Sequence, residues 1–268
     1  MSSVVQPSTS NLRTRLRWFC QRILSPRMTL RILQMGILRN LQARRPLSRN
    51  RQMATPWKVP KNLWRNRTVA ILASGPSLLE CLPALRARAG DVVAVAVNST
   101  GVSTKDDYGR LRPAACDWAD MLYAADSCWW RLYCEQALKF PGLKVTASSD
   151  VPWADVLYLR PTGPEGFDPL PGTIRTGGNS AYQAMHIAAQ AGARKIVLCG
   201  VDMHTKNGVH HHGHHPSPLR NPGEAELTHM ARRFTTFPFK ELGIEIVNCS
   251  KTSILQCFPK VDIEEALS

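Results

Sequence analysis

From residue 68 onward, the chain alternates short apolar runs with amphipathic stretches. The apolar runs are rich in Val, Ile and Ala and end in turn-forming residues, which is typical of buried strands. The amphipathic stretches place apolar residues at helical spacing. We predict strands at Val69–Ala73, Val92–Val97, Met121–Ala125, Lys144–Ala147, Lys195–Cys199 and Glu245–Val247, and helices at Leu78–Ala89, Trp129–Lys139, Ser180–Ala191 and Glu224–Leu242. The Pro- and Gly-rich segment Val151–Thr176 is expected to be an ordered loop over the sheet.

This alternation predicts an α/β, Rossmann-like fold for residues 54–268, with a mostly parallel sheet and helices on both of its faces. Eight cysteines without a C-x-x-C pair, two of them in predicted strands, favour reduced thiols in a cytoplasmic protein. The longest apolar window before this domain, Ile32–Leu38, is far shorter than the roughly 20 residues that span a bilayer.

The residues before the domain differ in charge. The first 67 residues contain fifteen of the 34 Lys and Arg residues and no Asp or Glu, which leaves 19 basic against 20 acidic residues in the remainder. We predict that residues 1–53 form a basic arm, helical or partly disordered, that contacts nucleic acid, an anionic membrane or an acidic protein. The alternative is that translation begins at Met53. The near-neutral body argues against a nucleic-acid footprint over the whole protein.

The turn Ser74-Gly75-Pro76-Ser77 joins the first predicted strand to a helix. Free N–H groups and the helix dipole favour an anion there, although a purely geometric turn explains the same residues. The other predicted strands also run into small polar or acidic residues, at Asn98, Asp126, Ser148, Asp202 and Asn248. Because ligands of open parallel sheets bind at the carboxyl ends of the strands, we expect the site at this edge.

A second turn, Thr176-Gly177-Gly178-Asn179-Ser180, precedes a helix of small residues. The glycines permit close backbone approach, and Asn179 or Ser180 can cap the helix. Beside Asp202 this turn could hold a sugar, a phosphate or a metal-bound diphosphate; a structural turn is the alternative.

Six of the eight histidines lie between His204 and His215. The spacing is not that of a closed structural zinc site and no cysteine flanks it, so we assign no metal ligand, although such a tract can bind metal adventitiously. A histidine on a mobile loop near Asp202 suits a general base. We therefore expect His212 or His215 to act as base or substrate contact, with a metal role or a solvated loop as the alternatives. His186, Trp129 and Trp130 are expected to pack in the core.

Three motifs, Ile71–Leu78, Thr176–Ser180 and Gly200–Asp202, resemble the 6-hydroxymethylpterin diphosphokinase-like superfamily. That group shares a Rossmann-like fold and a Gly-Pro-Ser loop with bacterial CMP-sialic-acid sialyltransferases. Over about residues 68–268 the chain is similar to uncharacterised phage-encoded proteins, through its Trp-Ala-Asp-x-Leu-Tyr stretch, the Arg-Thr-Gly-Gly-Asn-Ser turn, the His-rich loop and Asn248-Cys249-Ser250.

The resemblance implies that Gly75, Pro76 and Ser77 bind donor phosphates and that Asn98 contacts the nucleotide or the reacting group. It matches Asp202 to an acidic strand end and His215 or His212 to the base. A location in a bacterial host cell follows if the protein is phage-encoded.

Together these features predict a nucleotide-dependent transferase, glycosyltransferase-like, that moves a sugar from a nucleotide-sugar donor to a hydroxyl of an unknown acceptor. In this scheme Ser74–Ser77 bind the donor phosphates and Thr176–Ser180 position the second group. Asp202 orients the acceptor or Mg²⁺, the one cofactor considered, and Asp126, Asn248 and Ser250 belong to the cleft. The alternatives are diphosphate transfer from ATP, a non-catalytic phage protein that binds DNA or membrane through its arm, and metal-dependent hydrolysis through Asp126, Asp202 and His215.

Overall fold

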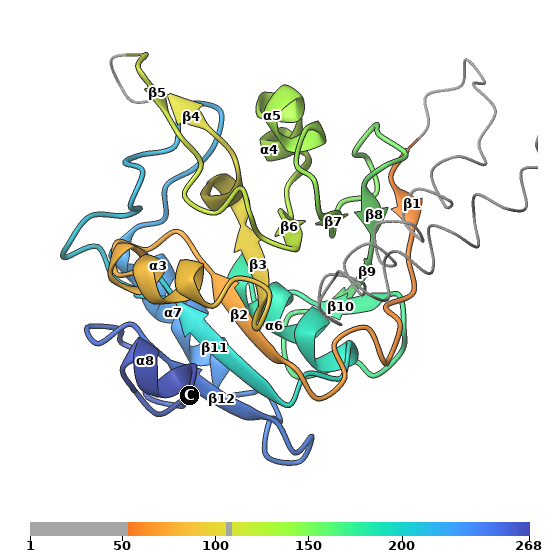
Figure 1. The fold of residues 1–268 in the computed structure, drawn as a ribbon. Helices are drawn as coiled ribbons and strands as arrows, with labels where there is room; N and C mark the ends of the chain where they lie inside the picture. Colours follow the sequence, from red (N-terminus) through yellow and green to blue (C-terminus); the bar gives the residue numbers. More distant parts are fainter. Residues whose placement is uncertain (1–52, 106–108) are drawn as a thin grey trace, which may run out of the picture. The chain divides into compact units, whose positions relative to one another are not determined.

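A computed structural model describes residues 53–105 and 109–268, which belong to one compact unit (Figure 1). The predicted arm therefore lies outside the described residues, apart from Met53. At the centre is an eight-stranded sheet in which every neighbouring pair of strands is parallel. This confirms the predicted α/β, Rossmann-like class.

The sheet has the spatial order β1-β8-β7-β6-β3-β2-β11-β12. Its strands are β1 (Thr55–Pro56), β2 (Thr68–Leu72), β3 (Val93–Val97), β6 (Met121–Tyr123), β7 (Leu143–Thr146), β8 (Leu157–Tyr158), β11 (Lys195–Cys199) and β12 (Glu245–Asn248). Two small sheets pair β9 (Arg160–Gly163) with β10 (Thr173–Arg175) and β4 (Thr104–Lys105) with β5 (Leu111–Arg112). The helices are α3 (Leu78–Ala87), α4 (Ser127–Leu132), α5 (Cys134–Leu138), α6 (Ser180–Gln190), α7 (Glu224–Phe234) and α8 (Ile263–Ala266), with a 3-10 turn, η1, at Asn98–Gly101.

The order of the strands reverses beside β2. Strands β3, β6, β7 and β8 follow one another on one side of it, whereas β11 and β12 lie on its other side. The loops after β2 and β11 therefore leave the same edge of the sheet at the point where the winding changes direction. Such a switch point is where open α/β sheets bind their ligands.

Both faces of the sheet are covered. Along β2, Val69 and Ile71 pack with α6 and α7 on one face, while Ala70 and Leu72 pack with α3, α4 and α8 on the other. Successive residues of a strand point to opposite faces, and both faces of this sheet are buried. The central strands are therefore continuous hydrophobic runs. Trp130 is fully buried and Trp129 is nearly so, as predicted for core residues.

Two predicted helices are shorter in the structure. The helix expected to reach Leu242 ends at Phe234, since Thr235 and Thr236 turn their hydroxyls back onto carbonyls of the last turn and Pro238 cannot continue a helix. The helix expected over 129–139 is divided into α4 and α5 at Tyr133, whose backbone leaves the helical region.

The segment 151–176 is also more regular than predicted, because it contains β8, β9 and β10. The first of these extends the large sheet by pairing with both β7 and β1. The alternation of apolar and polar residues is too short in these two- to four-residue strands to predict them.

The described cysteines, at positions 81, 116, 128, 134, 199, 249 and 257, are all free thiols. No helix among residues 53–105 and 109–268 is both long and apolar enough to cross a membrane.

Candidate functional site

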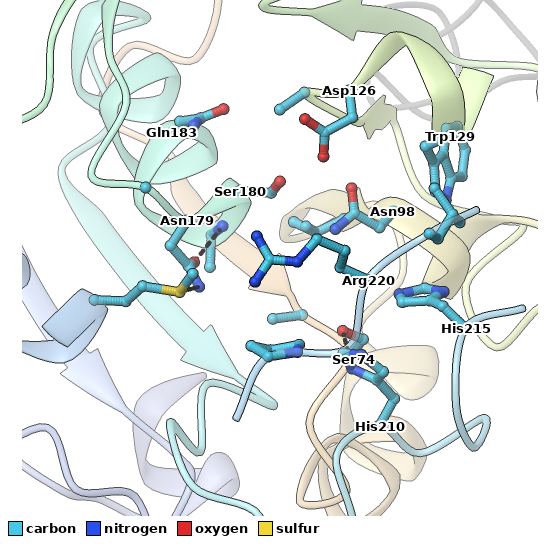
Figure 2. A pocket seen from close by; sticks show the side chains of 18 of the residues that line it. Ser74, Asn98, Asp126, Trp129, Asn179, Ser180, Gln183, His210, His215 and Arg220 are labelled. Carbon is cyan, nitrogen blue, oxygen red and sulfur yellow. Dashed lines mark hydrogen bonds between the residues drawn. The ribbon is translucent and has the colours of Figure 1, made fainter. Parts of the chain in front are cut away.

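A cleft of about 820 Å³ opens at the carboxyl edge of the sheet, beside the switch point (Figure 2). Residues that follow β2, β3, β6, β7 and β11 line it, together with the turn before α6, the His-rich loop and the start of α7. The predicted gathering of strand ends is therefore present, with the exception of the end of β12.

Most of the predicted site residues line this cleft. Ser74, Gly75, Asn98, Asp126, Ser148 and Asp202 come from strand ends, Thr176, Gly178, Asn179 and Ser180 from the turn before α6, and His215 from the His-rich loop. The others, Pro76, Ser77, Gly177, His212, Asn248 and Ser250, are not among its lining residues. Pro76 and Ser77 border a separate depression of about 250 Å³.

The carboxylate of Asp202 occupies the N-terminus of α3, where an anionic ligand was predicted. It accepts hydrogen bonds from the backbone N–H of Ser77, at 3.0 Å, and from the Ser77 hydroxyl. That hydroxyl also lies 2.6 Å from Ser250 Oγ, which accepts from the N–H of Val201 at 3.1 Å. The negative charge that the positive end of the α3 dipole favours is thus supplied by a side chain of the protein itself. This geometry favours a structural role for Ser77, Asp202 and Ser250.

Asn248 belongs to the same buried layer. It has no exposed surface, and its side-chain oxygen accepts a hydrogen bond of 3.0 Å from the N–H of Ser250. Asn248 and Ser250 therefore do not line the cleft to which they were assigned. Asn248 is the last residue of β12, and this end of the strand is covered by the chain segment at Pro259 and Lys260.

Gly75 is required by packing between two loops. Its N–H donates to the carbonyl of Gly200 at 2.9 Å, and a Cβ at this position would lie 2.5 Å from that carbonyl oxygen and 2.6 Å from Asp202 Oδ2. The loops after β2 and β11 can approach this closely only if residue 75 lacks a side chain.

Some residues of the turn before α6 stabilise the helix, and others line the cleft. Asn179 Oδ1 caps the helix by accepting from the N–H groups of Ala181, at 2.8 Å, and Tyr182, at 3.4 Å. This confirms the predicted cap and occupies that oxygen. Gly177 has a φ of +57° and lies against the Tyr182 ring. Ser180 is left to present its hydroxyl to the cleft (Figure 2).

Two cleft residues hold strained backbone. Asn98 has a φ of +52° and Met203 a φ of +59°, although neither is a glycine. Left-handed conformations in non-glycine residues cluster at ligand sites, because surrounding structure must hold them. Both follow central strands, β3 and β11, so the strain marks the middle of the switch point.

Asp126 presents a free carboxylate to the cleft (Figure 2). The residue is exposed in the open cleft, and none of the described residues hydrogen-bonds its side chain. Partial desolvation by the cleft walls raises the pKa of this carboxyl above its usual range. A carboxylate with a raised pKa in a cleft is suited to accept a proton from a substrate hydroxyl.

The His-rich loop is tied to the turn after β2. The N–H of His211 donates to the carbonyl of Ser74 at 2.8 Å, and Ser74 Oγ lies 3.0 Å from His210 Nδ1. Further along, the side chain of Asn221 pairs with the backbone N–H and carbonyl of His215, at 2.7 and 3.1 Å. The loop expected to be mobile is therefore held in place at both ends of the tract.

Burial lowers the pKa of His215 to about 4 and that of His212 to about 2, where neighbouring histidines add to the effect. Both rings are therefore neutral near pH 7. Of the two predicted bases, His215 lines the cleft, whereas His212 is buried behind it.

Sequence reasoning missed two cleft residues. Arg220 points into the cleft and, among the described residues that line it, is the only Arg or Lys (Figure 2). Its guanidinium pairs with Glu226 at 3.3 Å in an exposed contact. Gln183 on α6 joins the Tyr123 hydroxyl to the carbonyl of Thr176. Two features of the sequence could have indicated them: Arg220 is the first basic residue after the His tract, and Gln183 is a polar residue on an otherwise apolar face of α6.

No protein-family model matches the chain. No curated protein matches it either.

Two solved structures are similar to it. The MAf glycosyltransferase from Magnetospirillum magneticum AMB-1 aligns at 12% identity and a TM-score of 0.49, over 80% of this chain and 36% of that one. The sialyltransferase CstII from Campylobacter jejuni, in complex with the substrate analogue cytidine-5'-monophosphate, aligns at 13% identity and a TM-score of 0.44, over 74% of this chain and 85% of that one. The chain thus spans about a third of the first protein. Identities of 12% and 13% are not evidence that the proteins share a substrate or that matching residues share a role.

Proposed function

We propose that the protein is a nucleotide-dependent transferase that moves a sugar from a nucleotide-sugar donor to a hydroxyl group. The observation that carries the proposal is the composition of the cleft at the switch point. Among the described residues that line it, the cleft combines one guanidinium, Arg220, with the carboxylate of Asp126, whose pKa is raised by desolvation, and polar groups from two facing turns. A site of this volume accommodates a ligand of nucleotide size.

Arg220 is the group that would bind the donor phosphates. Its ion pair with Glu226 is exposed, with the side chains 84% and 38% accessible, so exchanging the carboxylate for a phosphate costs little. A guanidinium offers paired N–H donors that match phosphate oxygens. This replaces the predicted phosphate site at Ser77, where Asp202 already fills the helix N-terminus.

The remaining roles follow from position. Asn98 would contact the nucleotide or the reacting group, and Ser180 with the backbone of Thr176–Gly178 would position the sugar. Asp126 would take the proton of the acceptor hydroxyl as the new bond to the sugar forms, while the nucleotide leaves with the electron pair of the broken glycosidic bond. His215 is the alternative base.

A calorimetric screen of the full chain against CMP-, UDP- and GDP-sugars and ATP tests the proposal. We expect binding of one nucleotide-sugar class, and loss of that binding in Ser180→Trp, whose indole would enter the cleft. Leu79→Trp adds the same bulk on the exposed side of α3, where residue 79 is 52% accessible, and should bind normally. Binding of ATP alone would favour diphosphate transfer. Binding of none of these ligands, or equal loss in both variants, would contradict the proposed site.

A further inference from the structure

Three imidazole rings of the His-rich loop meet at the wall of the cleft. The ring centroids of His210, His212 and His215 lie 4.5, 4.9 and 5.0 Å apart in pairs, and one ring nitrogen from each lies within 4.8 Å of the other two. We call these three residues the histidine cluster. His211, between them in the sequence, packs the edge of its ring against His212, with centroids 5.1 Å apart, and places its Nε2 3.4 Å from Thr100 Oγ1.

The nitrogens inside the cluster lack partners. Within the described part of the chain, Nε2 of His210, Nε2 of His212 and Nδ1 of His215 are buried and make no hydrogen bond. Buried polar atoms are nearly always paired, and each exception calls for an explanation such as an ion. One cation between the three rings would give each of these nitrogens a partner.

The cluster is also oriented from outside. If Nδ1 of His210 carries its proton, it donates to Ser74 Oγ at 3.0 Å and leaves the Nε2 lone pair facing the cluster. Metal-binding histidines are held in this way by a hydrogen bond from the second ring nitrogen. At the opposite end of the loop, the side chain of Asn221 holds the backbone of His215 through two hydrogen bonds.

We propose that His210, His212 and His215 bind one divalent transition-metal ion, with Zn²⁺ the best match. Three imidazoles without a carboxylate suit zinc and its neighbours, whereas Mg²⁺ and Ca²⁺ prefer oxygen ligands. Three histidines with a fourth position for water or substrate form the ligand set of catalytic zinc sites. Tetrahedral zinc places its ligand nitrogens about 3.4 Å apart, so the rings would close in slightly around the ion.

This site takes up the metal role that was an alternative for the His-rich loop, in place of the assignment of no metal ligand. Because His210 and His215 also line the cleft, the ion would add positive charge to a lining in which Arg220 is the only Arg or Lys among the described residues. It would also remove His215 from consideration as the base and leave that role to Asp126. The metal site does not depend on which group the cleft transfers.

The test uses the full chain, produced without a histidine tag and stripped with a chelator. Zn²⁺ is titrated in competition with a chromophoric chelator, and Co²⁺ is added separately as a spectroscopic probe. We expect one ion per chain and a Co²⁺ spectrum of the intense tetrahedral type. His212→Gln should weaken Zn²⁺ binding by at least about 100-fold, because a ligand is lost, and this variant leaves every cleft side chain in place.

His214→Gln is the matched control, since it removes one histidine from the same tract at an exposed position outside the cluster. It should bind Zn²⁺ as the wild type does. Circular dichroism checks folding, and if His212→Gln does not fold, His215→Gln gives the same test at a less buried ring. Equal losses in the cluster and control variants would overturn the proposal by indicating adventitious capture by the tract. Less than one ion per chain in the wild type would also overturn it.

Discussion

Asp126 and Asp202 both follow parallel strands and both border the cleft, yet their surroundings give them different functions. The Asp202 carboxylate accepts hydrogen bonds from the backbone N–H and the hydroxyl of Ser77, and these bonds hold the start of α3 in place. The Asp126 carboxylate has no such partner among the described residues, and partial desolvation raises its pKa. The position of an acidic residue after a strand is therefore not enough to assign its role; the donors around its oxygens decide.

If Asp126 is the base, Asp126→Asn should lower kcat by about 10²- to 10⁴-fold while the donor binds as before. In the wild type, kcat should rise with pH through the raised pKa of this carboxyl, since only the ionised form accepts a proton, and the variant should lack that step. Steady-state kinetics across pH, with donor affinity measured separately, provide the check. A variant with full kcat would exclude Asp126 as the base.

Asp202→Ala should instead affect stability. Removing the carboxylate leaves the Ser77 N–H at a partly buried helix terminus unpaired, which costs about 1–3 kcal/mol in the free energy of unfolding. Chemical denaturation measures this, with Asp126→Asn as the matched control that should change stability little. Wild-type stability in Asp202→Ala, together with loss of nucleotide binding, would assign Asp202 to the ligand instead.

At the scale of elements, the site depends on two loops in direct contact. Gly75→Ala should destabilise the protein by about 1–3 kcal/mol, because its Cβ would overlap the Gly200 carbonyl and the loops after β2 and β11 would have to separate. Gly223→Ser is the control: no atom lies within 4 Å of an added Cβ, and serine caps α7 well. Denaturation curves in which both variants match the wild type would show that the close approach is unnecessary.

Helix α6 carries a buried histidine that we expect to lower the stability of the protein in acid. His186 is fully buried, accepts the N–H of Asp168 at its Nε2, and packs on Phe167 and Phe237. Burial lowers its pKa to about 3; the nearby Asp168 opposes this shift and Arg175 adds to it. The unfolded chain, with a pKa near 6.5, therefore binds a proton that the folded protein does not, and stability falls as pH drops below about 6.5.

For His186 alone, the loss of folding free energy between pH 7 and pH 5 is about 2 kcal/mol. His186→Gln should show a correspondingly smaller loss over this range, because glutamine does not titrate. Urea denaturation at several pH values measures the difference. Parallel pH dependences in the two proteins would mean that His186 is not held neutral.

The elements that the sequence predicted well are those that begin in an apolar run or an amphipathic stretch. Strands β2, β3, β6, β7, β11 and β12 and helices α3 and α6 agree with prediction within two residues. Strands β8, β9 and β10 were missed because their sequences, Leu-Tyr, Arg-Pro-Thr-Gly and Thr-Ile-Arg, contain no apolar run. The early end of α7 depends on Thr235 and Thr236, whose hydroxyls satisfy helix carbonyls in a way that hydrophobic periodicity does not reveal.

At the scale of the whole molecule, the site is assembled from segments about 150 residues apart. Sequence could place polar residues at strand ends, since parallel strands share one edge. It could not predict that Asp202 turns to Ser77, that Asn248 is covered, or that Arg220 reaches into the cleft, because each depends on loop packing between distant segments. The strained backbone of Asn98 and Met203 marks the same centre independently of those patterns.

The most direct test of the account compares the affinity of the full chain for a nucleotide-sugar with its affinity for the parent nucleoside, in the wild type and in Arg220→Met. A charged hydrogen bond to phosphate contributes about 1.5–3 kcal/mol, so the wild type should prefer the nucleotide-sugar by about 10- to 100-fold, and Arg220→Met should lose most of that preference while remaining folded. Equal preference in the two proteins, or no binding of any nucleotide-sugar, would contradict a donor site in this cleft.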